Sequence, residues 1–316
     1  MRWLEARQRE LLPSRYVHVV FTLPRELAPL ALQNKRLIYN LLFHSSAATL
    51  EIARDPRHLG AEIGFFSVLH TWDQRLQHHP HVHCVLAAAG LAPDHSRWIP
   101  APSFSPSRCS AACSAASSWP DSKSAFHTGT RQFYGNLAPL AAQGTFTSWL
   151  RLLFRHDWVV YAKRPFGGPE HALRYLSAYT HRIAISNHRL VALANGNVTF
   201  RWRDSAHANK KRLMTLPVNE FLRRFLLHLL PRGFVRIRNF GFLANRCRAA
   251  LLPLCFHLFQ STGLPQQIAA TQTSTHTRSA PLWNCPVCGG TMHVVEHLSP
   301  AQLLLRSPPL SRECAA

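Results

Sequence analysis

The sequence predicts an α+β fold, because segments with strand periodicity and segments with helix periodicity both occur along the chain. Residues 16–23 (YVHVVFTL) alternate and are β-branched, which predicts a strand that ends at Pro24. Residues 26–53 instead carry apolar side chains at helical spacing, among them Leu30, Leu37 and Leu41. Asn195-Gly196, between two alternating segments, is the dipeptide most typical of a tight hairpin turn.

The other elements follow from the same two periodicities. The first helix stops at Asp55-Pro56, since the residue before a proline avoids the helical conformation. A later helix begins at Glu170, where Pro169 occupies a first-turn position. In chain order, the remaining predicted elements are strands over 63–72 and 80–87, a helical segment over 133–154, a strand over 158–163, a turn at 165–169, the helix over 170–182, hairpin strands over 189–194 and 197–203, and a basic amphipathic helix over 220–230.

The charge of the chain indicates a polyanionic partner. Lys and Arg total 36 against 15 acidic residues, which gives a formal net charge of +21 and a pI near 10.9. Such an imbalance destabilises a compact state by self-repulsion unless a polyanion binds, and nucleic acid is the expected one. The basic residues are spread along the chain rather than gathered on one amphipathic helix, which argues against a membrane surface as partner.

Length and cysteine content narrow the class of protein. The 316 residues suffice for one large domain or two ordinary ones, and 47% hydrophobic residues can form a core. Eight cysteines in a chain of this length do not make a disulfide scaffold. Neither a signal-peptide core nor an apolar run of about 18 residues occurs. We therefore expect a protein of the reducing cytoplasm.

Two histidines stand two residues apart in a predicted strand. His81 and His83 would share one face, because alternate side chains of a strand point the same way. Two imidazoles on one face can hold a divalent cation if a third ligand reaches them from a neighbouring strand. The alternative is coincidence, since the chain has 20 histidines and some pairs arise by chance.

Two tyrosines stand four residues apart in the predicted helix over 170–182. Tyr175 and Tyr179 therefore share a helix face. Such pairs most often pack and form hydrogen bonds through their hydroxyls. A tyrosine hydroxyl can also attack a DNA phosphodiester and hold the strand as a phosphotyrosine. Its pKa near 10 makes it a poor nucleophile at neutral pH, so a metal that polarises the phosphate would assist.

These features together resemble the two-tyrosine HUH transposases of the insertion-sequence-91 family, in which HUH denotes His-hydrophobic-His. His81-Val82-His83 matches the HUH motif, and Tyr175 and Tyr179 match the tyrosine helix. The resemblance covers roughly residues 1–100 and 131–250. Further matching stretches are YVHVVFTLP (16–24), LHTWDQRLQHHPHVHCV (69–85), WVVYAKRPFGGPEHALRYL (158–176) and FLRRFLLHLLPRGFVRIRNFG (221–241).

The resemblance implies an HUH endonuclease-like antiparallel sheet flanked by helices, in a bacterial cytoplasmic protein. It implies rolling-circle transposition, in which single-stranded DNA at the element ends is cleaved and rejoined through a 5′-phosphotyrosine. Tyr175 and Tyr179 would be the nucleophiles, and Mg²⁺ or Mn²⁺ would bind His81, His83 and Gln74. Gln74 is preferred as third ligand because it matches the glutamine of the family's HTWGQ-like stretch, where Asp73 replaces glycine.

Basic residues after the tyrosine helix are the predicted DNA contacts. Arg182 directly follows that helix, and its guanidinium can either contact the phosphate or cap the helix C-terminus. The segment over 201–246 interleaves Arg and Lys with Phe and Trp, a pattern that suits phosphate binding and base stacking. The full predicted set is Arg182, Arg201, Arg203, Lys210, Lys211, Arg223, Arg224, Arg236 and Arg238.

The sequence departs from the family pattern in three places. The chain starts at the segment that follows the family's N-terminal zinc module, so we expect an N-terminally truncated member. Ala178 stands where the family often has a basic residue. Residues 103–122 are Ser/Ala/Cys-rich, which indicates either a flexible linker or, as our hypothesis, two compensating frameshifts. We divide the chain into a first core part (1–102), a disrupted segment (103–130), a second core part (131–260) and a loosely ordered tail (261–316).

The predicted tail contains a cysteine pair with zinc-ligand spacing. Cys285 and Cys288 form a CxxC, and His293 and His297 follow within a short loop. Together these four side chains predict a zinc knuckle, with a plain turn as the alternative.

Other functions share parts of this pattern. A replication initiator or relaxase uses the same catalytic residues, although the flanking stretches favour the transposase. A non-catalytic DNA-binding remnant of a transposase is favoured only by residues 103–122. An RNA-binding module is the weakest interpretation, because no aromatic RNA-binding signature occurs in the strands.

Overall fold

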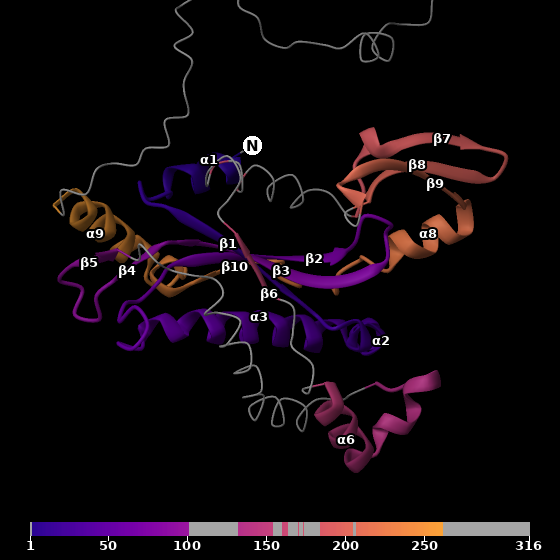
Figure 1. Ribbon diagram of the computed structural model, residues 1–316, viewed down its shortest axis with the longest axis horizontal. Coiled ribbons are helices and arrows are strands. Elements are labelled where there is room, and N and C mark those ends of the chain that lie inside the picture. The colour runs from indigo at the N-terminus through magenta and orange to yellow at the C-terminus, as the bar shows by residue number, and fades with distance from the viewer. Residues whose placement is uncertain are drawn as a thin grey trace, which may run out of the picture. The chain divides into compact units, whose positions relative to one another are not determined.

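The computed structural model describes residues 2–100, 132–153, 160–163, 170, 173, 184–204 and 207–261 (Figure 1). The chain divides into two compact units, Met1–Gln267 and Ile268–Ala316, and every described residue belongs to the first. The α-helices are α1 (Arg2–Arg9), α2 (Ala28–Gln33), α3 (Lys35–Glu51), α6 (Gln143–Leu153), α8 (Val218–Leu226) and α9 (Arg248–Ser261). The strands are β1 (Tyr16–Thr22), β2 (Phe65–Trp72), β3 (His78–Ala87), β4 (Ala89–Leu91), β5 (Trp98–Pro100), β6 (Val160–Lys163), β7 (Leu190–Ala194), β8 (Asn197–Asp204), β9 (Lys210–Pro217) and β10 (Ile237–Phe240).

The predicted α+β class is confirmed. Five strands form an antiparallel central sheet in the order β10-β2-β3-β1-β6, with β3 in the middle. The strands predicted over 16–23, 63–72, 80–87 and 158–163 are all members of this sheet. The predicted disrupted segment over 103–130 and the predicted tail beyond Ser261 lie outside the described residues.

One face of the central sheet carries the main hydrophobic core. Val17, Val19 and Phe21 alternate along β1 and are buried against residues of α2 and α3, such as Leu30 and Phe43. Burial on one face explains the period-two pattern of this strand, since only every second side chain enters the core. The other face is described below as the histidine face, because it carries His18, His70, His81 and His83.

The histidine face is covered in part by α1 and by Leu173. Its apolar side chains, including Phe66, Val68 and Val85, form a separate cluster. Leu4 of α1 packs on this cluster, and Leu173 lies within it with no exposed surface. Helices therefore flank both faces of the sheet.

The helix predicted over 26–53 is divided in the structure. A short 3-10 turn (Arg25–Leu27) precedes α2, and Asn34 separates α2 from α3. Asn34 leaves the helical conformation at φ −127° and ψ 47°, and its side-chain amide donates to the carbonyls of Leu30 and Gln132. Asparagine commonly replaces helical hydrogen bonds in this way, because its short side chain competes with the backbone.

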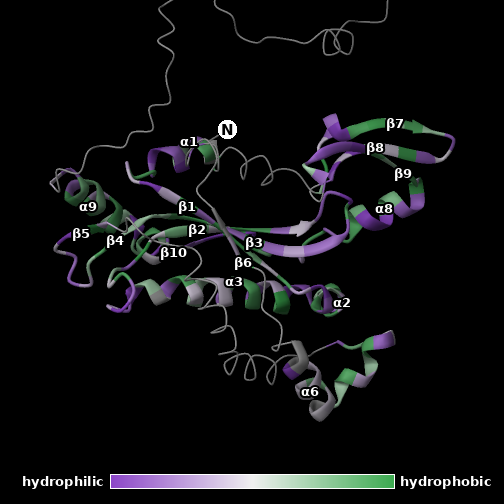
Figure 2. Cartoon of the chain, in the orientation of Figure 1, coloured by the Kyte–Doolittle hydropathy of each residue, from purple (hydrophilic) through white to green (hydrophobic). Residues whose placement is uncertain are grey.

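A second sheet is built from β7, β8 and β9. The predicted hairpin is confirmed, with Asn195 at φ 49° and Gly196 at φ 70°, the positive values that a type I′ turn needs. Phe200, on one face of this sheet, is buried against Phe221 and Phe225, which lie in and around α8. β9 was not predicted. Figure 2 shows that β7 is apolar along its length, and its side chains are all exposed.

The remaining described elements form a smaller core. The hairpin of β4 and β5 packs with α9, and Trp98, Phe242 and Phe259 contribute aromatic contacts. Among the described helices, none is both long and apolar enough to cross a membrane.

Candidate metal centre

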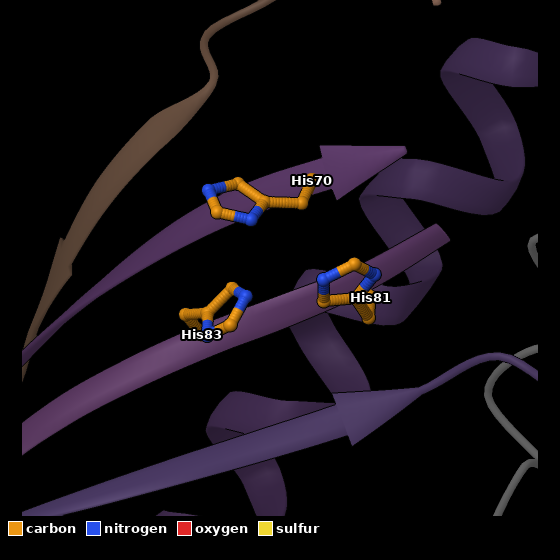
Figure 3. Close-up of side chains that lie close together, drawn as sticks. All are labelled: His70, His81 and His83. Carbon is orange, nitrogen blue, oxygen red and sulfur yellow. The ribbon is translucent and has the colours of Figure 1, made fainter. Parts of the chain in front are cut away.

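Three histidines gather on the histidine face (Figure 3). His70 lies on β2, and His81 and His83 lie on the neighbouring strand β3. One potential ligand atom from each residue lies within 4.8 Å of the other two. The ring centroids are 4.3 Å apart for His70 and His83, 5.3 Å for His70 and His81, and 4.8 Å for His81 and His83. Among the described residues, this is the group that could hold a metal ion.

The sheet register brings the three side chains together. His70 is paired with His81 across the antiparallel ladder, so the two side chains point to the same face. His83 follows His81 by two residues and shares that face by alternation. A turn over 73–77 closes the β2–β3 hairpin and fixes this register.

Burial keeps the three imidazoles neutral. Burial lowers the pKa of His81 to about 4. Burial, followed by the effect of neighbouring histidines, holds the pKa of His70 and of His83 well below the ordinary 6.5. A neutral imidazole has a nitrogen lone pair available for a metal, whereas a protonated one has none. The group therefore retains ligand character throughout the neutral pH range.

The ring orientation of His81 is set by the backbone. Its Nδ1 lies 2.7 Å from the carbonyl oxygen of His79. Since a carbonyl only accepts, His81 Nδ1 carries the proton and Nε2 carries the lone pair. Metal-ligating histidines commonly have such a partner on the second ring nitrogen.

A fourth histidine contacts this group and was not predicted from the sequence. His18 of β1 lies with its Nε2 at 2.8 Å from Nδ1 of His83. The two rings are stacked, with centroids 5.0 Å apart and an interplanar angle of 17°. The alternation of YVHVVFT could have indicated His18, because it is polar on a strand whose other face is apolar.

The predicted third ligand, Gln74, has contacts in the small sheet and just before it. Its Oε1 lies 3.4 Å from the backbone nitrogen of Arg203, and its backbone carbonyl accepts from the Arg189 guanidinium at 2.5 Å. His70 occupies the neighbouring-strand position instead. His70 could have been identified from the sequence by pairing the predicted strands 63–72 and 80–87 as a hairpin, because such a hairpin places His70 opposite His81.

The predicted nucleophiles Tyr175 and Tyr179, together with Arg182, lie outside the described residues. Leu173, two residues before Tyr175, is helical and fully buried in the cluster on the histidine face. The four predicted zinc ligands also lie outside the described residues, and the zinc knuckle stays a prediction: Cys285, Cys288, His293 and His297.

The predicted DNA-binding residues fall into separate environments. Arg201 and Arg203 of β8 and Lys211 of β9 are exposed on the face of the small sheet that points away from α8, which we call the outer face. Lys210 is also exposed, but it pairs with Asp204 in the register and so lies on the other face.

The other predicted cations are held by protein groups. Arg223 and Arg224 both pair with Glu220, at 2.6 and 2.7 Å. Arg238 stacks over Phe43 at 4.3 Å, against the main core rather than on the histidine face. The guanidinium carbon of Arg236 lies 6.0 Å from the ring centroid of Trp72, which follows His70 by two residues and stacks on its ring.

The donor set fits a divalent transition metal. Three imidazole nitrogens suit first-row transition ions, whereas Mg²⁺ prefers oxygen ligands in octahedral geometry. Of the two cations predicted from the sequence, Mn²⁺ therefore fits the described residues better than Mg²⁺.

Comparison with known proteins gives a family match over the part of the chain that contains these histidines. The family described as "Putative transposase" (Y2_Tnp) matches residues 64–250, which include all three histidines. The chain is 46% identical to the putative transposase y4qJ of Sinorhizobium fredii (strain NBRC 101917 / NGR234), over 93% of this chain and 76% of that protein. It is 28% identical to the transposase for insertion sequence element IS801 of Pseudomonas savastanoi pv. phaseolicola, over 92% of this chain and 70% of that protein. No solved structure matches significantly. The chain thus belongs to the putative transposase family.

Proposed function

We propose that this chain is a two-tyrosine HUH transposase of the insertion-sequence-91 type, which cleaves and rejoins single-stranded DNA at element ends. The observation that carries the proposal is the group of His70, His81 and His83 on the sheet face where Leu173 is buried. Leu173 is buried on that face and lies two residues before Tyr175. We therefore expect Tyr175 or Tyr179 to be able to reach the metal centre.

The proposed metal ligands are His70, His81 and His83. His70 replaces Gln74 in this assignment, because His70 is paired with His81 and Gln74 contacts Arg203. A divalent cation at this group would polarise the scissile phosphate and neutralise charge that develops on it. The histidines are neutral and mutually close, so little reorganisation is needed to bind the cation.

The proposed reaction is a transesterification. The hydroxyl oxygen of Tyr175 or Tyr179 attacks the phosphorus, and the bond from phosphorus to the 3′ oxygen breaks. The tyrosine loses its proton to solvent, and the departing 3′ oxygen takes one up and becomes a 3′-OH. The new 5′-phosphotyrosine is a phosphodiester like the bond it replaces, so rejoining needs no nucleotide triphosphate.

The proposed DNA contacts include Arg201, Arg203 and Lys211 on the outer face of the small sheet. These three cations have no carboxylate partner among the described residues, while the nearby Asp204 pairs with Arg212 and lies on the other face. Unneutralised cations on one exposed face suit a phosphate backbone, which would release counterions on binding.

An adduct assay tests the proposal. The full chain is incubated with Mn²⁺ and single-stranded DNA that contains the element ends, and covalent protein–DNA product is measured on a denaturing gel. We expect an adduct in the parent chain and none in the Tyr175→Phe/Tyr179→Phe double variant. Tyr134→Phe, at an exposed tyrosine outside the sheet, is the matched control.

The assay also separates the alternatives. Tyr161 is 55% exposed and is paired with Val20, which places it on the histidine face as well. Loss of the adduct in Tyr161→Phe, with the double variant still active, would assign the nucleophile to Tyr161 and overturn our assignment. DNA binding without any adduct in the parent chain would instead support a DNA-binding remnant.

A further inference from the structure

A hydrogen-bonded pair of histidines lies beside the candidate metal centre, and one member is not a candidate ligand. We propose that His18 is a positioning residue, whose Nε2 accepts the Nδ1 proton of His83 and so directs His83 Nε2 to the metal. The inference rests on the proposed metal centre. It assigns a role to a strand that contributes no ligand.

The sheet geometry makes this contact specific. Val20, not His18, is paired with His83, and His18 is paired with Val85 two residues further along β3. His18 and His83 are therefore diagonal neighbours on one face, a separation that large side chains can bridge. The bridge is closed by the 2.8 Å contact between His18 Nε2 and His83 Nδ1 and by the stacking of the two rings.

Proton placement follows from this contact. A neutral imidazole has one N–H and one lone pair, so only one of the two nitrogens in contact can donate. If His83 binds a metal through Nε2, its lone pair is used there and its proton must reside on Nδ1. His18 Nε2 then accepts, and the proton of His18 is confined to its own Nδ1.

The two β3 ligands thus use different partners. His81 donates to the backbone carbonyl of His79, which no substitution of a side chain removes. His83 depends on the side chain of His18, which a substitution does remove. The predicted loss is therefore confined to the ligand that His18 orients.

The test compares metal affinity in three forms of the full chain. His18→Leu keeps apolar bulk and removes the acceptor, and His18→Gln restores an amide oxygen at a similar reach. We expect Mn²⁺ affinity, measured by titration calorimetry or by the electron paramagnetic resonance of free Mn²⁺, to fall about 10- to 100-fold in His18→Leu. We expect His18→Gln to recover most of it.

The matched control is His78, a half-buried histidine whose Nε2 forms a hydrogen bond with the hydroxyl of Tyr39 at 2.8 Å. His78→Leu should leave Mn²⁺ affinity unchanged, and thermal unfolding of every variant should show a folded protein. Nitrogen-15 NMR of histidine-labelled protein with diamagnetic Zn²⁺ gives an independent readout, because it reports which nitrogen of His83 carries the proton.

Each outcome decides the proposal. Parent-like affinity in His18→Leu overturns it, and so does equal loss in the Leu and Gln variants, since ring stacking rather than the acceptor would then matter. A parent chain that binds no Mn²⁺ removes the metal centre and the proposal together. A parent chain that binds Mn²⁺ but forms no DNA adduct contradicts the proposed function and leaves the role of His18 standing.

Discussion

His70 and His81 are paired across the β2–β3 hairpin, with their ring centroids 5.3 Å apart. The pairing depends on strand register, because a slip of one residue would turn every side chain of β2 to the opposite face. In β2 such a slip would move Leu69 to the histidine face and His70 toward the main core. The buried apolar residues that fix the register therefore also fix the geometry of the candidate metal centre.

The first prediction concerns the identity of the third ligand. His70→Ala should lower Mn²⁺ affinity by more than the roughly 10- to 100-fold that is typical of a lost partner outside the ligand set. Gln74→Ala should leave it near the parent value, because the Gln74 side chain contacts the backbone of Arg203 and its carbonyl contacts Arg189. Titration calorimetry on both variants measures the difference. The reverse pattern would return Gln74 to the ligand set.

Most of the central sheet was predictable from the sequence, because β1, β2 and β3 are each buried on at least one face. The alternation of YVHVVFT and the long apolar run of β2 both reflect that burial. β10 was not predicted, since its four residues, Ile237–Phe240, alternate too briefly to be distinguished from a loop. β9 was missed for another reason: its side chains are mostly exposed and its first three residues are basic, so no apolar period marks it.

The site was predictable only in part. His81 and His83 follow from local alternation, which a single strand reveals. His70 and His18 depend on which strands are neighbours and in which register, and that information is tertiary. Gln74 was preferred from resemblance, which aligns residues along the chain but does not place them in space.

The second prediction concerns DNA binding by the outer face of the small sheet. Replacing Arg201, Arg203 and Lys211 by Gln should weaken binding of single-stranded DNA and make its salt dependence shallower. For three lost phosphate contacts, the slope of log affinity against log salt should change by about 2. Fluorescence anisotropy at several salt concentrations measures both quantities.

The control for this surface removes the same charge elsewhere. Arg7, Arg54 and Arg57 each form an ion pair at 2.6 or 2.7 Å with an acidic side chain. Their triple Gln variant should keep a salt dependence close to that of the parent chain. Equal effects of the two triple variants would show that net charge, rather than the outer face, determines affinity.

The third prediction is a dependence of stability on pH. Burial lowers the pKa of His78 to about 3 and that of His228 to about 4. Above pH 6.5 both the folded and the unfolded chain leave these groups neutral, so their full contribution to stability is present. Below pH 6.5 these two histidines become protonated in the unfolded chain but stay neutral in the folded chain, until the pH falls to their lowered pKa values. The free energy of unfolding should therefore fall by up to about 1.4 kcal/mol per pH unit for each histidine.

Chemical denaturation between pH 7 and pH 4.5 measures this fall. His228→Gln should make it shallower by about one proton, although the variant is less stable throughout because the contacts of His228 with Thr71 and Leu76 are altered. His188→Gln, at an exposed histidine, is the control and should leave the slope unchanged. An unchanged slope in His228→Gln would contradict the assignment.

The last prediction concerns the glycine that directly follows β10, the strand beside β2. Gly241 has φ +59°, and a Cβ at this position would collide with the carbonyl group of Ile63. Gly196 has a similar φ of +70°, but a Cβ there would meet no atom within 4 Å. Left-handed backbone alone costs about 1 to 2 kcal/mol for a residue with a Cβ. Gly196→Ala should lose about that much stability, whereas Gly241→Ala should lose clearly more, because backbone must also move. Equal losses in thermal unfolding would mean that the backbone around Gly241 shifts without cost, which would contradict this prediction.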